Sequence, residues 1–255
     1  MTQHLLLGQT LSFTGDPIVS DWRDVTHHDS AGAVLVADGR IAATGPATAL
    51  RRDYPQAKIH DYGNALITAG FVDAHMHYPQ TAMIASWGKR LIDWLNTYTF
   101  PEEMQFGDRA YADEIAARTL DLALAHGTTT LTSFCTIHPE SVDAFFSAAQ
   151  GRDMALLGLW HGKGRATYAI TPRFTPTSTP DQLHALGALW REYPDCLMQT
   201  HLSEQVDEIA WVRDLHPQAR DYLDTYESAG LLGERGLYGH AIHLEPREID
   251  RIAEV

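Results

Sequence analysis

Two histidines, His75 and His77, lie two positions apart at the end of the apolar segment GFVDAHMH. Because side chains two positions apart lie on the same face of a strand, both imidazoles would point in one direction. Neutral imidazole is a preferred nitrogen ligand of zinc, so the pair favours a metal site. Taken alone the pair is a weak signal, since two ordinary histidines at the end of a strand fit the spacing equally well.

Further polar residues follow two other strand-like segments. His201, in QTHLSE, would complete a set of three nitrogen ligands around a zinc ion that keeps a position open for water. Glu204 lies three residues later and could move protons to and from that water, although an acid also suits an ordinary first helical turn. His240, in the segment GLYGHAIHL, again lies at a strand end and is a fourth candidate. His243 would face the opposite side of the same strand.

A second group of residues could recognise a planar ligand. Arg173, at the end of TYAITPRF, offers a planar fork of donors, and Gln80 can donate and accept at once. Phe174 or Trp94 could stack on the face of a heterocycle. Each of these residues alone is explained as well by an ion pair or by the core, so the inference rests on the set.

The surrounding pattern predicts an α/β fold with parallel strands. Apolar segments of strand length alternate with amphipathic stretches of helical length from Leu66 onward. Helices are expected over 108–125, 139–150 and 180–192. The six predicted strands are LITAGFVDAH, TTTLTSFCT, MALLGLW, TYAITPRF, LMQTHLSE and GLYGHAIHL. In a parallel barrel the ends of such strands meet at one mouth, which would bring the polar residues together.

Two parts are expected. Residues 1–65 carry short apolar runs broken by Asp38-Gly39, a hairpin signal, and form a small N-terminal β-sandwich portion. Residues 66–255 form the barrel portion, with about six of eight strands. The link from Trp160 to Arg165 is short for a parallel crossover, and the chain stops inside a helical pattern. An (α/β)₈ TIM-type barrel needs roughly 250 residues, so an incomplete barrel is predicted.

The composition limits the classes of partner and the cellular compartment that we expect for this protein. The 255 residues carry a formal charge of -14, with no basic cluster that could bind phosphates, so nucleic acid is excluded as a partner. No apolar run reaches the roughly 20 residues of a membrane helix, and no signal peptide begins the sequence. Cys135 and Cys196 lie far apart, which indicates a reducing cytoplasm.

The motifs together resemble guanine deaminases of the amidohydrolase superfamily. The resemblance rests on GFVDAHMHYPQ, SWGKRLIDWLNTYTFPEE, HGTTTLTSFCTIHPESVDAFF, YAITPRFTPTSTPDQL, QTHLSEQVDEIAWV and TYESAGLL. It implies an (α/β)₈ barrel with a small β-sandwich, and the zinc-dependent hydrolysis of guanine to xanthine and ammonia, a step of purine catabolism. Homodimers are common in the family.

The resemblance also implies individual roles. It makes His75, His77 and His201 the zinc ligands and Glu204 the proton shuttle. His240 would contact the activated water and its oxyanion. The residues that would hold the purine are Gln80, Arg173 and Phe174.

The chain departs from the family in two places. It is shorter between MALLGLW and YAITPRF, and it ends before the strand that carries a metal-binding aspartate in the family. Two alternatives therefore stay open: an amidohydrolase acting on another aminated or halogenated heterocycle, and a non-catalytic zinc-binding fragment. Imidazole suits iron as well as zinc, so the sequence leaves the choice between Zn²⁺ and Fe²⁺ open.

Overall fold

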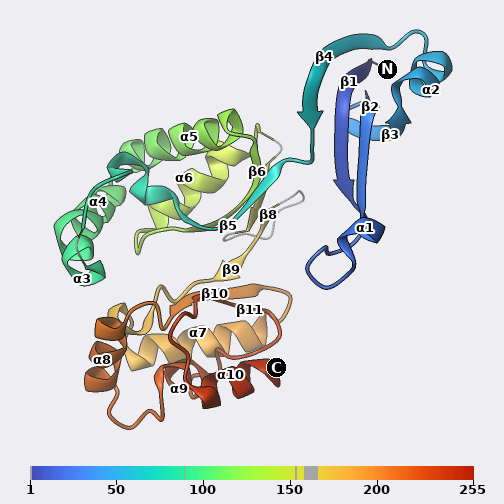
Figure 1. The fold of residues 1–255 in the computed structure, drawn as a ribbon. Helices are drawn as coiled ribbons and strands as arrows, with labels where there is room; N and C mark the ends of the chain where they lie inside the picture. Colours follow the sequence, from blue (N-terminus) through green and yellow to red (C-terminus); the bar gives the residue numbers. More distant parts are fainter. Residues whose placement is uncertain (1, 89, 153, 158–165) are drawn as a thin grey trace. The chain divides into compact units, whose positions relative to one another are not determined.

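The computed structural model describes residues 2–88, 90–152, 154–157 and 166–255. The chain forms two compact units, Met1–Gly70 and Phe71–Val255. Figure 1 draws the fold in sequence colours, with the first unit in blue and teal.

The first unit is a four-stranded sheet in the order β3-β2-β1-β4, in which β1 runs antiparallel to β2 and parallel to β4. Asp38 and Gly39 both have positive φ, 51° and 74°, as a tight two-residue hairpin turn requires, and they join β2 to β3. The predicted hairpin is thus confirmed. The elements are β1 (Gln3–Phe13), α1 (Trp22–Val25), β2 (Thr26–Ala37), β3 (Arg40–Pro46), α2 (Ala47–Asp53) and β4 (Lys58–Ile67).

The second unit contains two parallel sheets, ordered β5-β6-β7-β8 and β9-β10-β11. Neighbours along the chain are neighbours in the sheets, as in the wall of an α/β barrel. The strands are β5 (Phe71–His77), β6 (Thr128–Phe134), β7 (Ala155–Leu157), β8 (Ala166–Thr167), β9 (Ala169–Ile170), β10 (Leu197–Leu202) and β11 (Gly236–His240).

Several predicted strands differ from these bounds. The strand expected over 167–174 is divided between β8 and β9 and ends at Ile170. The strand expected over 66–75 is divided, because Leu66 and Ile67 end β4 of the first unit and β5 begins at Phe71. The strand expected over 236–244 ends at His240, where positive φ at His240 and Ala241 turns the chain away. Part of MALLGLW and the short link from Trp160 to Arg165 lie outside the described residues.

The helices of the second unit begin where the sequence signals place them. The Asp108 carboxylate accepts from the backbone N–H groups of Ala110 and Tyr111, and Thr179 caps the helix at Pro180. The predicted helices over 108–125, 139–150 and 180–192 are confirmed to within one residue. The helices are α5 (Arg109–Ala125), α6 (Pro139–Ala149), α7 (Pro180–Glu192), α8 (Val206–Leu215), α9 (Tyr222–Glu227) and α10 (Pro246–Ala253).

A chain of short helical turns joins β5 to α5. Its third element is a π-helical turn, a form often found at functional sites. Gly88 packs against Trp94, the residue just before this turn, so closely that a Cβ at position 88 would lie 2.5 Å from the Cβ of Trp94. The turns are η1 (Tyr78–Met83), α3 (Leu91–Trp94), η2 (Leu95–Thr99), α4 (Phe100–Glu103) and η3 (Met104–Gly107), and η4 (Thr175–Thr177) precedes α7.

Each unit has its own buried core. Leu5 and Leu35 centre the core of the first unit. In the second unit, one cluster around Tyr78 and Phe145 lies under α5 and α6, and another around Leu223 and Tyr226 packs among the later helices. None of the described helices is both long and apolar enough to cross a membrane.

Candidate metal and active site

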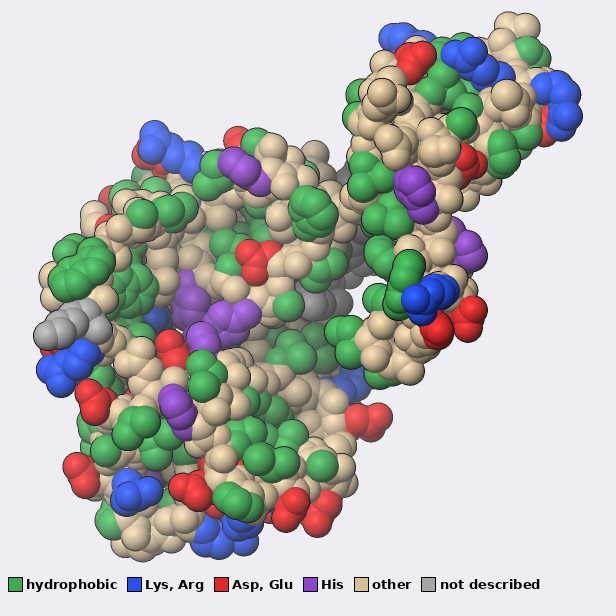
Figure 2. Space-filling model, viewed as in Figure 1, with side chains coloured by type: hydrophobic (Ala, Val, Ile, Leu, Met, Phe, Trp, Pro, Cys, Tyr) green, Lys and Arg blue, Asp and Glu red, His purple; other side chains and the backbone are tan. Residues whose placement is uncertain are grey.

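Histidines from three parallel strands meet at one place in the second unit. The ligand nitrogens of His75 on β5, His201 on β10 and His240 on β11 all lie within 4.8 Å of one another. Figure 2 shows histidine side chains gathered at a hollow of this unit. Three imidazole nitrogens converging at this spacing could hold one metal ion.

His77 borders the same group. Its Nε2 atom lies 3.0 Å from Nε2 of His201, and its buried Nδ1 has no hydrogen-bond partner. Both rings of the predicted HxH pair therefore point toward His201, whereas the converging group of three contains His240 and not His77. The role of His77 as a ligand stays a prediction.

Contacts around the histidines fix their orientation. Nδ1 of His201 lies 2.7 Å from the backbone oxygen of Arg173 and must donate to it, which leaves the Nε2 lone pair for the site. The Phe134 ring stacks on His77 with the ring centres 4.7 Å apart. Gly239 faces His75 so closely that a Cβ would lie 2.6 Å from the imidazole Cε1.

Burial favours the neutral form of His75, His77 and His201. It lowers the pKa of His77 well below the usual range and that of His201 to about 3. Burial also lowers the pKa of His75, with a further contribution from the charge of His240. A metal ligand must be deprotonated, so the donor set of this cluster fits a divalent ion.

Glu204 lies beside the histidines. Its Oε2 atom is 3.4 Å from Nε2 of His240. Burial raises the pKa of Glu204, while the neighbouring His240 lowers it. Ser203, just before Glu204, has φ 49°, so the chain turns directly after β10 and directs the next residue to the site. A half-buried carboxyl with a raised pKa is suited to proton transfer.

The predicted ligand-binding residues line the same cavity, which has a volume of about 210 Å³. Gln80, Arg173 and Phe174 all contribute to its wall. Trp94 of α3 and Leu95 of the π-helical turn also do so. The structure thus brings together every site residue that the sequence indicated: His75, His77, Gln80, Arg173, Phe174, His201, Glu204 and His240.

Sequence reasoning missed three residues at this site. Glu103 contacts both Gln80 and Arg173, Phe134 packs on the histidines, and Gly239 makes room for His75. Phe134 and Gly239 could have been found from their places in predicted strands. No sequence signal distinguishes Glu103 from its neighbour Glu102, because the turn between them and β5 is irregular.

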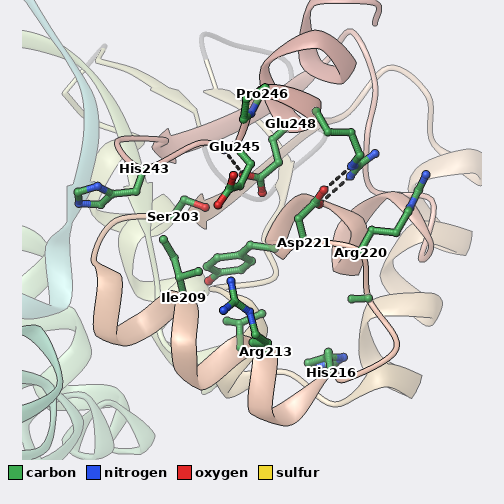
Figure 3. Close-up of a pocket in the computed structure, with 14 residues that line it drawn as sticks. Ser203, Ile209, Arg213, His216, Arg220, Asp221, His243, Glu245, Pro246 and Glu248 are labelled. Carbon is green, nitrogen blue, oxygen red and sulfur yellow. Dashed lines mark hydrogen bonds and ion pairs between the residues drawn. The ribbon is translucent and has the colours of Figure 1, made fainter.

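A second cavity, of about 300 Å³, lies among α8, α9 and α10 (Figure 3). Its acids are engaged: Asp221 pairs with Arg247, and Glu248 accepts from the backbone N–H of Leu223 at 2.9 Å. The group of three converging ligands found among the described residues is not at this cavity. The smaller histidine-lined cavity is therefore the candidate active site.

A parallel α/β wall with imidazoles at three strand ends is typical of metal-binding α/β barrel proteins. Residues 66–255 match the amidohydrolase family, and residues 32–57 match an imidazolonepropionase-like composite domain of bacteria. The chain therefore belongs to the amidohydrolase family, and the predicted fold class is confirmed.

Several guanine deaminases are similar to this chain. That of Escherichia coli (strain K12) is 39% identical over 253 residues, which cover 88% of this chain and 58% of that protein. The crystal structure of guanine deaminase from Bradyrhizobium japonicum is 32% identical with a TM-score of 0.92, covering 100% of this chain and 62% of that one. A guanine deaminase from C. acetobutylicum with bound guanine in its active site is 26% identical, with a TM-score of 0.82, covering 99% of this chain and 66% of that one.

The predicted resemblance to guanine deaminases is thus confirmed. The chain spans about three fifths of the length of these relatives.

Proposed function

We propose that this chain binds guanine and catalyses its hydrolytic deamination to xanthine and ammonia. The observation that carries the proposal is one cavity that holds a histidine cluster, a carboxyl with a raised pKa and the pair Gln80 and Arg173. The similarity to guanine deaminases, one of them with bound guanine, supports the same substrate. We propose a cytoplasmic location because Cys135 and Cys196, the two cysteines of the chain, lie far apart in the sequence.

The wall of the cavity suits a purine. Phe174 and Trp94 offer aromatic surface to the faces of the ring, and Arg173 offers donors to its acceptor atoms. Held in this way, the carbon that bears the exocyclic amine would lie toward the histidines. Holding the purine in this orientation would lower the activation free energy of the attack by water.

Glu204 is the residue we assign to proton transfer. Its carboxylate would take one proton from the attacking water and deliver it to the ring nitrogen. It would then take the second proton from the added hydroxyl and deliver it to the exocyclic amine, which leaves as ammonia when the C–N bond breaks. His240, 3.4 Å away, would stabilise the negative charge that develops on the attacking oxygen.

The residues that we propose to hold a metal are His75, His77 and His201, which leaves His240 for its contact with the attacking oxygen. A bound zinc ion would supply a Lewis acid that lowers the pKa of water. We propose zinc as the metal, because three neutral imidazoles are a common zinc ligand set.

The test uses the 255-residue chain with one equivalent of zinc and follows guanine loss and ammonia release. We expect Glu204→Gln to lower turnover by about 10²–10⁴-fold, the usual contribution of general acid–base catalysis. Glu234→Gln, which changes an exposed carboxylate, is the matched control and should leave turnover unchanged.

Two outcomes would overturn the proposal. Turnover of cytosine without turnover of guanine would indicate a different heterocycle as substrate. Tight zinc binding with no turnover of either would indicate a metal-binding chain without catalytic activity.

A further inference from the structure

Glu103, the last residue of α4, contacts both Gln80 and Arg173, two polar residues that line the candidate ligand cavity. One carboxylate oxygen accepts from Nη1 of Arg173, and the other lies 3.4 Å from Nε2 of Gln80. Glu103 is only 8% exposed. No described contact of Glu103 is needed to build the helix itself, because the end of α4 is made by backbone hydrogen bonds.

The contact with Gln80 settles the orientation of its amide. A carboxylate can only accept hydrogen bonds, so Gln80 must turn its NH₂ group toward Glu103. The amide oxygen, Oε1, is then left as an acceptor for the cavity that Gln80 lines. The nitrogen and oxygen of the Gln80 amide are thus assigned from the hydrogen bond, because only the nitrogen can donate to the carboxylate of Glu103.

The contact with Arg173 restrains the guanidinium. Glu103 accepts from Nη1, and the Phe100 ring lies beneath the group with its centre 5.8 Å from Cζ. The N–H groups that these contacts leave over are donors and can meet only an acceptor on the ligand. Arg173 and Glu103 are both largely buried, at 17% and 11% side-chain exposure, so neither charge is well hydrated without the other.

We propose that Glu103 is a positioning residue that sets the order of donor and acceptor along the ligand edge. With Glu103 ionised, Arg173 presents donors and Gln80 presents an acceptor. This order matches a cyclic amide, in which a carbonyl oxygen lies next to an N–H, as in a 6-oxopurine. A 6-aminopurine such as adenine presents the reverse order. The inference deepens the proposed function and rests on it.

The variant that tests this role is Glu103→Gln. Its amide keeps the size of the side chain but can donate to Gln80 as well as accept, so the orientation of the Gln80 amide is no longer fixed. Glu102→Gln is the matched control, since Glu102 lies on the same turn and contacts Tyr111 and Gln105 outside the cavity.

The measurement is the dissociation constant of guanine and of adenine by calorimetry for each zinc-loaded chain, with Glu204→Gln present in all of them so that guanine is not consumed, and with bound zinc measured in parallel. We expect Glu103→Gln to weaken guanine binding at least about tenfold and to reduce the preference for guanine over adenine by a similar factor. Zinc content should not change, and Glu102→Gln should match the unmodified chain. A merely structural role would not alter the ratio between the two purines.

The outcomes separate the two proposals. A guanine-to-adenine ratio in Glu103→Gln equal to that of the unmodified chain would overturn the role of Glu103 and leave the proposed function intact. Failure of the unmodified, zinc-loaded chain to bind guanine would overturn the proposed function and this inference with it.

If Glu103→Gln does not fold, Glu103→Asp decides the matter. Aspartate keeps the charge and the acceptor oxygens, but its side chain is one methylene shorter, so the carboxylate lies farther from Gln80 and Arg173. Guanine binding should weaken while the preference over adenine persists, and guanine affinity equal to that of the unmodified chain would overturn the inference.

Discussion

At the scale of single residues, the position of His75 depends on the absence of a side chain on the neighbouring strand. Gly239 pairs with His201 across β10 and β11, and its backbone lies against the His75 ring. A Cβ at position 239 would lie 2.6 Å from Cε1 and 2.9 Å from Nδ1 of that ring, closer than real contacts allow. The histidine cluster thus needs a glycine that is not itself a ligand.

Gly239→Ala should therefore displace the His75 ring and weaken zinc binding. We expect a loss of about 10–100-fold in affinity, the usual effect of disturbing a group that orients a metal ligand. Competition with a chromophoric chelator measures it. Gly151→Ala is the control, because nothing lies within 4 Å of a Cβ at that position. Equal zinc affinity in all three chains would show that His75 is not a ligand or that its ring can move freely.

At the scale of elements, a buried carboxylate holds two helices together. Glu248 on α10 accepts from the backbone N–H of Glu245 at 2.7 Å and from that of Leu223 at 2.9 Å, and is 1% exposed. The first contact begins α10, and the second joins it to α9. One side chain thereby satisfies a buried donor on α9 and the backbone donor of Glu245, the residue that caps α10.

We expect Glu248→Ala to lower the free energy of unfolding by about 1–3 kcal/mol, the usual cost of leaving a buried donor such as the Leu223 N–H unpaired. Urea unfolding followed by tryptophan fluorescence reports on the second unit, since five of the six tryptophans lie after Gly70. Asp250→Ala, an exposed change on the same helix, should have little effect. A similar shift in both variants would contradict the role of Glu248.

The elements also show what the sequence could and could not predict. Period-two spacing and strand ends were enough to bring His75, His77, His201 and His240 together, because the ends of parallel strands meet at one edge. The position of Glu103 beside Gln80 and Arg173 could not be predicted from the sequence. It depends on a π-helical turn over Leu95–Thr99, which shifts every later side chain around the helix axis relative to an α-helical pattern.

At the scale of the whole molecule, the outer strands of the two sheets in the second unit expose apolar side chains. Val72 on β5 is 63% exposed and Leu237 on β11 is 41% exposed. Among the described residues, β5 pairs only with β6, and β11 only with β10. Unpaired backbone groups beside apolar side chains favour association of strand edges.

We expect the 255-residue chain to self-associate with increasing concentration, and the combined change Val72→Lys and Leu237→Lys to reduce this, because a charge on an edge strand opposes pairing. Sedimentation velocity over a wide concentration range measures the effect. Ile18→Lys, at a position 91% exposed in the first unit, is the control for added charge. A monomer at every concentration would contradict the expectation.

The contact between Arg173 and His201 has a consequence for how such a protein can change over generations. Arg173 holds the His201 imidazole through its backbone oxygen, whereas we propose that it meets the ligand through its guanidinium. Every amino acid supplies the first group, and only the side chain supplies the second. A mutation of the Arg173 codon can therefore alter which molecules are accepted while the oxygen that orients the histidine is inherited unchanged. Selection for a different substrate could therefore act on the side chain at position 173 without loss of the backbone contact that orients His201.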